Sequence, residues 1–380
     1  MSATSSLSAL PTPALLLDER KMLANIARLR DRPALAGVAL RPHLKTAKSV
    51  EVARRVLAGG NGPATVSTLR EAEVFFAAGI RDILYAVGIA PQKLPRVAAL
   101  RTAGCDLTVL LDSIEQADAV VAASAAAGAP IPALIEIDCD GHRGGLPADD
   151  PQIIEIGRRL HAGALLRGVL THAGESYGVV GAAAHAAFAE RERHAAVSAA
   201  IRLHEHGLPC PIVSVGSTPT AFAAIDLDGV TEVRAGVYMF FDLVMAGIEA
   251  CRVEDIALSV LTTVIGHQRD RGWILVDAGW MALSRDRGTA VQTVDQGYGV
   301  VSDIDGNVLP DLIVTAANQE HGVIALGAGS TAGLPAMPVG TRLRILPNHA
   351  CATAGQHGAY EVIPAEPGAP LAHWPRFGGW

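Results

Sequence analysis

The chain has 380 residues, of which 50% are hydrophobic and 18% are charged, and its formal net charge is −7. This composition supplies a sizeable core, and the length predicts one large domain with a smaller second one. The negative charge and the lack of a polybasic run argue against a nucleic acid partner.

The cysteines and the apolar stretches indicate the cellular compartment and whether the chain spans a membrane. The five cysteines are widely spaced and form no C-x-x-C pair, which predicts free thiols in a reducing, cytoplasmic compartment. They are Cys105, Cys139, Cys210, Cys251 and Cys351. Residues 1–6 lack the basic and then apolar pattern of a secretory signal. Asp118, Gly128 and two prolines interrupt the longest apolar stretch, so we expect no membrane span there.

In chain order, residues 14–18 are predicted to form a short strand and residues 19–29 an amphipathic helix. Short apolar runs then alternate with alanine-rich helical segments. Eight strands are predicted, at 38–41, 64–67, 82–87, 106–111, 133–138, 168–171, 212–215 and 232–235. Helices are predicted between them, at 49–58, 69–78, 92–102, 113–127, 151–162 and 181–206.

These strands are continuously apolar rather than alternating, and each one precedes a helix. This pattern indicates parallel pairing with both faces of the sheet covered. Eight such units predict an α/β fold with a closed (β/α)8 barrel over residues 13–252. An open, doubly wound sheet is the alternative.

From residue 253 onward the segments are shorter and richer in valine, threonine and turn residues. Asp305-Gly306-Asn307 is a plausible hairpin turn. We therefore expect a mostly antiparallel β domain over 253–380, with residues 1–12 added to it.

Polar residues gather where the predicted barrel strands end, which is where barrel enzymes carry their chemistry. The first strand opens into Arg41-Pro42-His43-Leu44-Lys45-Thr46. A lysine with its stem in a hydrophobic sheet is desolvated, so its pKa should fall and its amine could form a Schiff base. A solvated surface lysine is the alternative interpretation.

The ends of strands seven and eight carry small residues. Gly216-Ser217-Thr218 follows the seventh strand and Gly236-Val237 follows the eighth. The loops after these two strands usually form the phosphate-binding site of this fold. Small residues allow backbone N–H groups to approach an anion, although Gly-Ser-Thr is also ordinary turn chemistry. Together with a lysine that can bind an aldehyde, two such loops predict pyridoxal 5'-phosphate.

The β domain contains two further candidate features. If the strand at 343–346 continues, His349 and Cys351 point to the same face and can share a divalent metal, with zinc favoured. A packed histidine beside a buried cysteine is the alternative. Arg285 and Arg287 could bind a second substrate carboxylate, or could belong to a solvated turn.

These motifs together resemble the D-serine dehydratase and D-threonine aldolase family, which has the alanine racemase-like fold of a barrel and a β domain. The resemblance extends over nearly the whole chain. The matching segments are Arg41–Ser49, Val66–Glu73, Asp138–Gly144, His172–Tyr177, Gly216–Thr220, Glu232–Asp242, Asp277–Gly279 and His349–Cys351.

The resemblance implies roles for individual residues. Lys45 would bind the cofactor covalently and act as the base for the α-proton. Other cofactor contacts would come from Thr68, Arg143, Tyr177, Ser217, Thr218, Gly236, Val237 and Tyr238. His349 and Cys351 would hold zinc, with manganese or cobalt as alternatives. Aldolase relatives carry His-x-Asp at that pair, so Cys351 favours dehydration.

The resemblance thus implies a homodimeric, pyridoxal phosphate- and metal-dependent ammonia-lyase acting on small D-β-hydroxy amino acids. 3-Hydroxyaspartate would give oxaloacetate and D-serine would give pyruvate, each with ammonia. A D-threonine-type aldolase is the alternative enzyme. A non-catalytic pyridoxal phosphate-binding protein is a more distant alternative, because such proteins usually lack the β domain.

Overall fold

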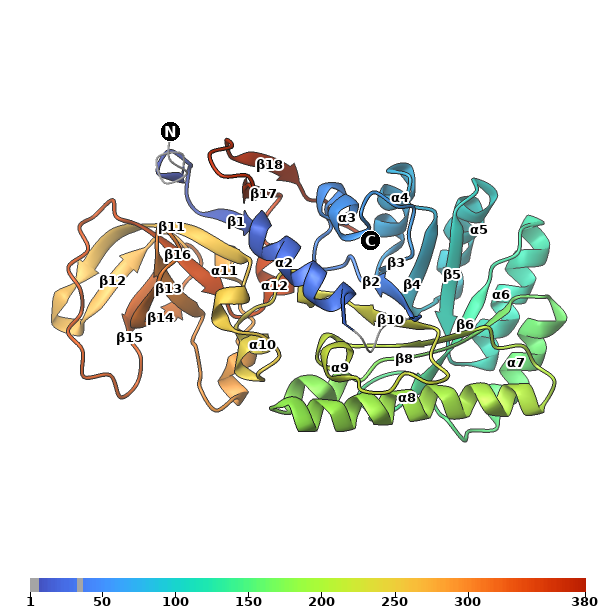
Figure 1. The fold of residues 1–380 in the computed structure, drawn as a ribbon. Coiled ribbons are helices and arrows are strands. Elements are labelled where there is room, and N and C mark those ends of the chain that lie inside the picture. Colours follow the sequence, from blue (N-terminus) through green and yellow to red (C-terminus); the bar gives the residue numbers. More distant parts are fainter. Residues whose placement is uncertain (1–6, 33–36) are drawn as a thin grey trace. The chain divides into compact units, whose positions relative to one another are not determined.

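The computed structural model describes residues 7–32 and 37–380 (Figure 1). Contacts between residues divide these into two units. The barrel unit holds the described residues of Arg28–Gly236 together with Gly379–Trp380, and the β unit holds the described residues up to Ala27 together with Val237–Gly378. The sequence placed 13–27 and 237–252 with the barrel, so the observed grouping differs from the expected boundaries at both junctions.

The barrel unit contains eight parallel strands in the order β2-β10-β9-β8-β6-β5-β4-β3. A single parallel bridge between His43 and Thr65 brings the two end strands together, so the barrel is nearly closed. The expected eight strands are confirmed. They are β2 (Ala39–Pro42), β3 (Ala64–Val66), β4 (Asp82–Gly88), β5 (Asp106–Leu111), β6 (Ala133–Asp138), β8 (Leu166–Thr171), β9 (Ile212–Val215) and β10 (Glu232–Ala235).

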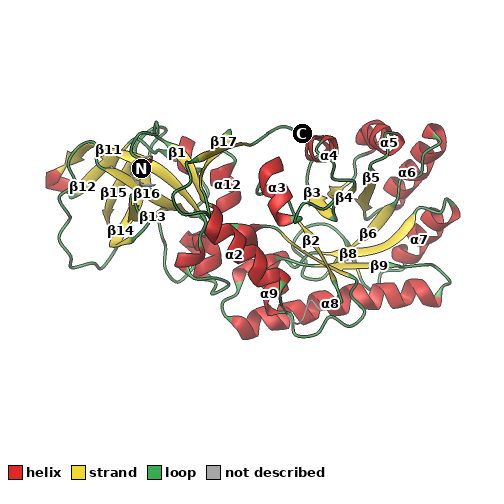
Figure 2. Ribbon diagram, turned by 45° about the horizontal axis from the view of Figure 1, so that its top comes forward, coloured by secondary structure: helices red, strands yellow, loops and turns green. Residues whose placement is uncertain are grey.

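Helices surround these strands on the outside (Figure 2). They are α3 (Val50–Val56), α4 (Leu69–Ala77), α5 (Leu94–Thr102), α6 (Ile114–Ala127), α7 (Gln152–Ala162), α8 (Ala182–Glu205) and α9 (Thr218–Ala223). Local sequence explains their limits: α6 begins at a capping box of Ser113 and Gln116 and ends at Gly128, whose φ of 60° is left-handed. A short strand, β7 (Leu146–Pro147), adds to β6.

The core of the barrel explains why the strands were recognisable. Leu84, Leu110, Leu134 and Leu170 come from four neighbouring strands and pack into one buried cluster. Strands covered on both faces need apolar residues at successive positions, which produces the continuous runs seen in the sequence.

The β unit contains a mostly antiparallel sheet in the order β12-β15-β14-β13-β16-β11-β1-β17-β18, in which β12 also pairs with β11. That pairing closes six strands into a ring. The strands are β1 (Ala14–Asp18), β11 (Leu258–Gln268), β12 (Trp273–Val276), β13 (Gly299–Asp303), β14 (Val308–Ala317), β15 (Gly322–Leu326), β16 (Arg342–Pro347), β17 (Ala359–Ile363) and β18 (Ala372–Pro375).

Strand β1 belongs to this sheet because it pairs with β11 antiparallel and with β17 parallel. The remaining helices are α2 (Glu19–Arg30), α10 (Leu243–Gly247), α11 (Trp280–Leu283) and α12 (Ala350–Ala354). Within the described chain, no helix combines the length and hydropathy needed to cross a membrane. The five cysteines are free thiols, as expected.

Candidate active site

Lys45 lies three residues beyond the end of β2, in a turn. Its side chain is exposed, so the expected burial of its stem in the sheet is wrong: the strand ends at Pro42, before the lysine is reached. The neighbouring Lys48 lies 3.4 Å from the buried carboxylate of Glu71, whereas the amine of Lys45 pairs with none of the described residues. Lys45 is therefore the more available nucleophile of the two.

Two imidazoles next to Lys45 are held neutral. Burial lowers the pKa of His43 well below its usual value, and the charges of Lys45 and Arg234 lower it further. Burial likewise lowers the pKa of His172 to about 3, with Arg143 and Lys45 adding to the effect. Three cations thus act on one region at the carboxyl ends of the strands, a field that attracts anionic groups.

Hydrogen bonds fix both rings. His172 Nδ1 donates to the Gly216 carbonyl oxygen at 2.8 Å, because a carbonyl can only accept. His43 Nδ1 accepts from the Lys45 backbone N–H at 3.4 Å, and its Nε2 lies 3.4 Å from Ser67 Oγ. His172 Nε2 therefore keeps a free lone pair, while His43 is oriented by the loop that carries Lys45.

The predicted phosphate loop after β9 is organised by side-chain hydrogen bonds. Ser217 caps α9 by accepting from the Thr220 N–H, and Tyr177 Oη accepts from the Thr218 N–H at 3.3 Å. Thr218 Oγ1 is buried and has no hydrogen-bond partner among the described residues. A buried hydroxyl without a partner is costly, and a bound oxyanion would satisfy it.

A residue that the sequence reasoning missed supports this loop. Glu192 of α8 is buried and accepts from the N–H groups of Ala173 and Gly216, each at 2.9 Å, and from Thr220 Oγ1 at 2.8 Å. Burial raises its pKa. Glu192 therefore connects the loop after β8 to the loop after β9. No feature of the sequence marks Glu192 for this role, since a glutamate within a long helix usually faces solvent.

The other predicted cofactor residues make contacts of their own. Arg143 is half-exposed and lies 3.9 Å from Glu136. Thr68 caps α4 by accepting from the Glu71 N–H. Gly236 ends the barrel unit, where an added Cβ would lie 3.0 Å from the His43 carbonyl oxygen, and buried Val237 and Tyr238 begin the β unit.

In the β unit, His349 and Cys351 do not continue a strand. Strand β16 ends at Pro347, His349 is the N-cap of α12, and Cys351 lies within that helix, so the expected strand-like alternation is wrong. Even so, the Cys351 thiol hydrogen-bonds to the His349 imidazole. The pair is brought together by a helical turn instead of by a strand.

Carboxylates surround this pair. His349 Nδ1 donates to Asp286 Oδ2 at 2.6 Å, and buried Asp242 accepts from the Ala350 N–H at 2.8 Å. Burial disfavours the imidazolium, yet Asp286, Cys351 and Asp242 together raise the pKa of His349 to about 11. This environment stabilises positive charge, whether a proton or a metal ion carries it. The described residues include no cluster of three or more His, Cys, Asp or Glu suited to a metal, so His349 and Cys351 would leave open positions.

The two candidate substrate arginines differ in their surroundings. The Arg287 guanidinium pairs with Asp295 at 2.5 Å and lies over the Tyr298 ring. The Arg285 guanidinium lies over the Trp280 ring, 4.4 Å from its centroid, and forms no ion pair with the described residues. Arg285 therefore has charge to offer a ligand, whereas that of Arg287 is already balanced.

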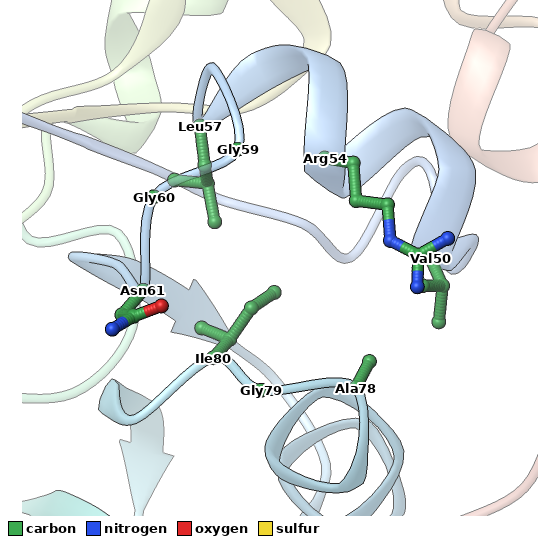
Figure 3. A pocket seen from close by; sticks show the side chains of 9 residues that line it. All are labelled: Val50, Arg54, Leu57, Gly59, Gly60, Asn61, Ala78, Gly79 and Ile80. Carbon is green, nitrogen blue, oxygen red and sulfur yellow. The ribbon is translucent and has the colours of Figure 1, made fainter.

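A separate cavity of about 210 Å³ lies elsewhere in the barrel unit, between α3 with the chain that follows it and the chain after α4 (Figure 3). Arg54, Leu57, Asn61 and Ile80 are among its lining residues. These segments precede β3 and β4, so the cavity is at the amino ends of the strands, whereas Lys45 follows a carboxyl end. The cavity is therefore not part of the candidate site around Lys45.

Comparison with known proteins now gives the family. Residues 17–244 match the model "Alanine racemase, N-terminal domain", and residues 257–363 match the model "Putative serine dehydratase domain". A D-threo-3-hydroxyaspartate dehydratase from Delftia sp. (strain HT23) is 56% identical over 379 residues, covering 99% of each chain. The chain belongs to the D-serine dehydratase and D-threonine aldolase family. A D-serine dehydratase from Dictyostelium discoideum is 30% identical and covers 93% of each chain.

Solved structures agree with this family. The Delftia enzyme superposes with a TM-score of 0.94 at 55% identity, covering 99% of this chain and 100% of that one. Two variants of a D-threo-3-hydroxyaspartate dehydratase superpose with TM-scores of 0.94 and 0.95, at 54% and 55% identity and with at least 97% of each chain covered. In one a cysteine is replaced by alanine, in a metal-free form, and in the other a histidine is replaced by alanine.

Proposed function

We propose that this chain is a pyridoxal phosphate- and metal-dependent dehydratase of D-β-hydroxy amino acids. It would convert D-threo-3-hydroxyaspartate to oxaloacetate and ammonia, or D-serine to pyruvate and ammonia. The observation that carries the proposal is the contact between the Cys351 thiol and the His349 imidazole, in a chain that is 56% identical to a D-threo-3-hydroxyaspartate dehydratase. The histidine and the cysteine altered in the two solved variants of a D-threo-3-hydroxyaspartate dehydratase lie two positions apart, the same spacing as His349 and Cys351.

The barrel residues fit a ligand that carries an aldehyde and a phosphate. Lys45 offers an unpaired amine, Thr218 offers an unpaired buried hydroxyl, and cations surround the neutral His43 and His172. The donor set of one imidazole and one thiol among carboxylates likewise fits a divalent metal, with zinc favoured by the sulfur ligand.

When bound, pyridoxal phosphate would supply an electron sink for charge left at Cα, and the metal would supply a Lewis acid for the β-hydroxyl. Lys45 would remove the α-proton, since its amine is paired with no carboxylate among the described residues. Loss of water gives an enamine, and hydrolysis of that enamine releases the keto acid and ammonia. His349 and Cys351 would hold the metal, and Ser217 and Thr218 would bind the phosphate.

Product analysis distinguishes this reaction from the aldolase alternative. Purified protein should be assayed with a panel of D- and L-β-hydroxy amino acids, with and without added zinc or manganese. A dehydratase releases ammonia and a keto acid from D-substrates, whereas an aldolase releases glycine and an aldehyde. Retained cofactor with no turnover of any substrate would support the non-catalytic alternative. The homodimer is a separate prediction, which light scattering of the same protein tests.

A further inference from the structure

The ring of His349 is fixed by a carboxylate that lies in the loop after α11. His349 Nδ1 and Asp286 Oδ2 are 2.6 Å apart. A carboxylate, ionised near neutral pH, only accepts hydrogen bonds. Nδ1 therefore carries the proton, and Nε2 is the nitrogen available to a metal.

The backbone around His349 is held separately. The Asn348 amide donates to Thr289 Oγ1 at 2.7 Å and to the Gly297 carbonyl oxygen at 2.8 Å. On the other side, Asp242 accepts from the Ala350 N–H. These contacts fix the position of the main chain but not the rotation of the imidazole, which is left to Asp286 and Cys351.

We propose that Asp286 is the positioning residue of the metal site. Its carboxylate would hold the His349 ring with Nε2 toward the side of Cys351 and supply negative charge behind that ligand. Carboxylates that accept from the outer N–H of a ligating histidine fix its tautomer and increase its strength as a donor. The inference rests on the proposed function, because it assumes that His349 and Cys351 hold the metal.

The chain offers a matched control for this role. Asp295 pairs with Arg287 at 2.5 Å, and its side chain is 43% exposed against 40% for Asp286. Asp295→Asn removes a similarly short surface ion pair nine residues away, but the broken pair does not include a proposed metal ligand. If Asp286 only held its loop in place, substitutions of Asp286 and Asp295 should have similar effects on metal affinity.

The test measures metal affinity directly, without using turnover. The cofactor-loaded enzyme is depleted of metal and titrated with zinc against a chromophoric chelator. Asp286→Ala should weaken zinc binding by about 10- to 100-fold. Asp286→Asn should weaken it less, because its amide oxygen can still accept from Nδ1, and Asp295→Asn should stay within about twofold of wild type. With cobalt(II) in place of zinc, the visible spectrum should change for Asp286→Ala but not for Asp295→Asn.

Two outcomes would overturn the inference, and they are distinguishable. If His349→Ala loses zinc but both Asp286 variants bind it within twofold of wild type, the metal site stands and Asp286 has no positioning role. If His349→Ala itself binds zinc like wild type, the proposed metal site is wrong and the inference fails with it. Thermal unfolding is measured for each variant, and if Asp286→Ala does not fold, Asp286→Asn carries the test.

Discussion

In the barrel unit two imidazoles lie among cations, whereas in the β unit one imidazole lies among carboxylates and a thiol. The consequence is opposite in sign: the pKa of His172 falls to about 3, and that of His349 rises to about 11. Both side chains are partly or largely enclosed, and burial alone lowers the pKa of each. The difference therefore comes from neighbouring charges, with Arg143 and Lys45 acting on one ring and Asp286 and Cys351 on the other.

The comparison suggests that the two units are specialised for ligands of opposite charge. A region with Lys45, Arg143 and Arg234 favours anionic groups such as a phosphate or a carboxylate. A region with Asp242, Asp286 and Cys351 favours a cation. Variants in the barrel unit should therefore affect the binding of anionic groups, and variants in the β unit should affect the binding of a metal ion.

The largest effect is expected from Lys45→Ala. This variant should lose the absorbance band of the lysine-bound cofactor, and ammonia release should fall by about 10²- to 10⁴-fold or more, because both the proposed anchor and the proposed base are removed. Lys48→Ala is the matched control and should keep the band, since the Lys48 amine pairs with Glu71. Survival of the band in Lys45→Ala, with its loss in Lys48→Ala, would identify Lys48 as the anchor.

Cys351→Ala should impair metal binding in the β unit without affecting cofactor binding in the barrel unit. Elimination should fall by about 100-fold or more, because Lewis-acid stabilisation of the leaving hydroxyl is worth several kcal/mol. The cofactor band should remain, and bound zinc, measured by atomic absorption, should be lost. Cys105→Ala removes a buried thiol ahead of β5 and should retain both metal and turnover. Full turnover by Cys351→Ala without metal would contradict the metal role.

Arg285→Ala should change substrate preference. We expect the ratio of kcat/KM for D-threo-3-hydroxyaspartate to that for D-serine to fall by about 10- to 100-fold, the value of one charge-assisted hydrogen bond. Arg287→Ala should change it less, because Asp295 already balances that charge. If neither variant alters the ratio, the loop does not bind the second carboxylate.

The smallest effect is a pH dependence of stability from His172. The folded pKa is about 3 against 6.5 for an ordinary histidine, so below pH 6.5 the unfolded chain takes up a proton that the folded chain excludes. The free energy of unfolding should therefore fall by about 1 kcal/mol between pH 6.5 and 5.5 on this account. His172→Asn keeps a donor for Gly216 and should flatten denaturant-measured stability over that range. An unchanged slope would show that His172 is not held neutral.

The fold was predictable where local pattern decides it. The eight barrel strands are continuous apolar runs because both of their faces are covered, and helix ends such as Gly128 are set by local chemistry. The partner of β1 was not predictable, since its buried Leu15, Leu16 and Leu17 suit either sheet equally well. Strand pairing between distant segments leaves no local trace in a single sequence.

The sequence allowed the residues of the candidate site to be predicted, but not the local structure that holds them. Lys45 and the His349–Cys351 pair stand out by their positions, and their roles stay predictions. The sequence did not show that Pro347 ends the strand, and so it gave the wrong local structure at Cys351. Asp286 lies in the loop that was predicted to bind substrate through Arg285 and Arg287. Its role could not be predicted, because it depends on a contact with His349 that the sequence does not show.

The most direct test of the account is ammonia release from D-threo-3-hydroxyaspartate by enzyme depleted of metal and then given zinc. The account predicts that depletion abolishes ammonia release while leaving the cofactor band intact, and that zinc restores release together with oxaloacetate. Undiminished ammonia release from metal-free enzyme, or glycine and glyoxylate as the products, would contradict it.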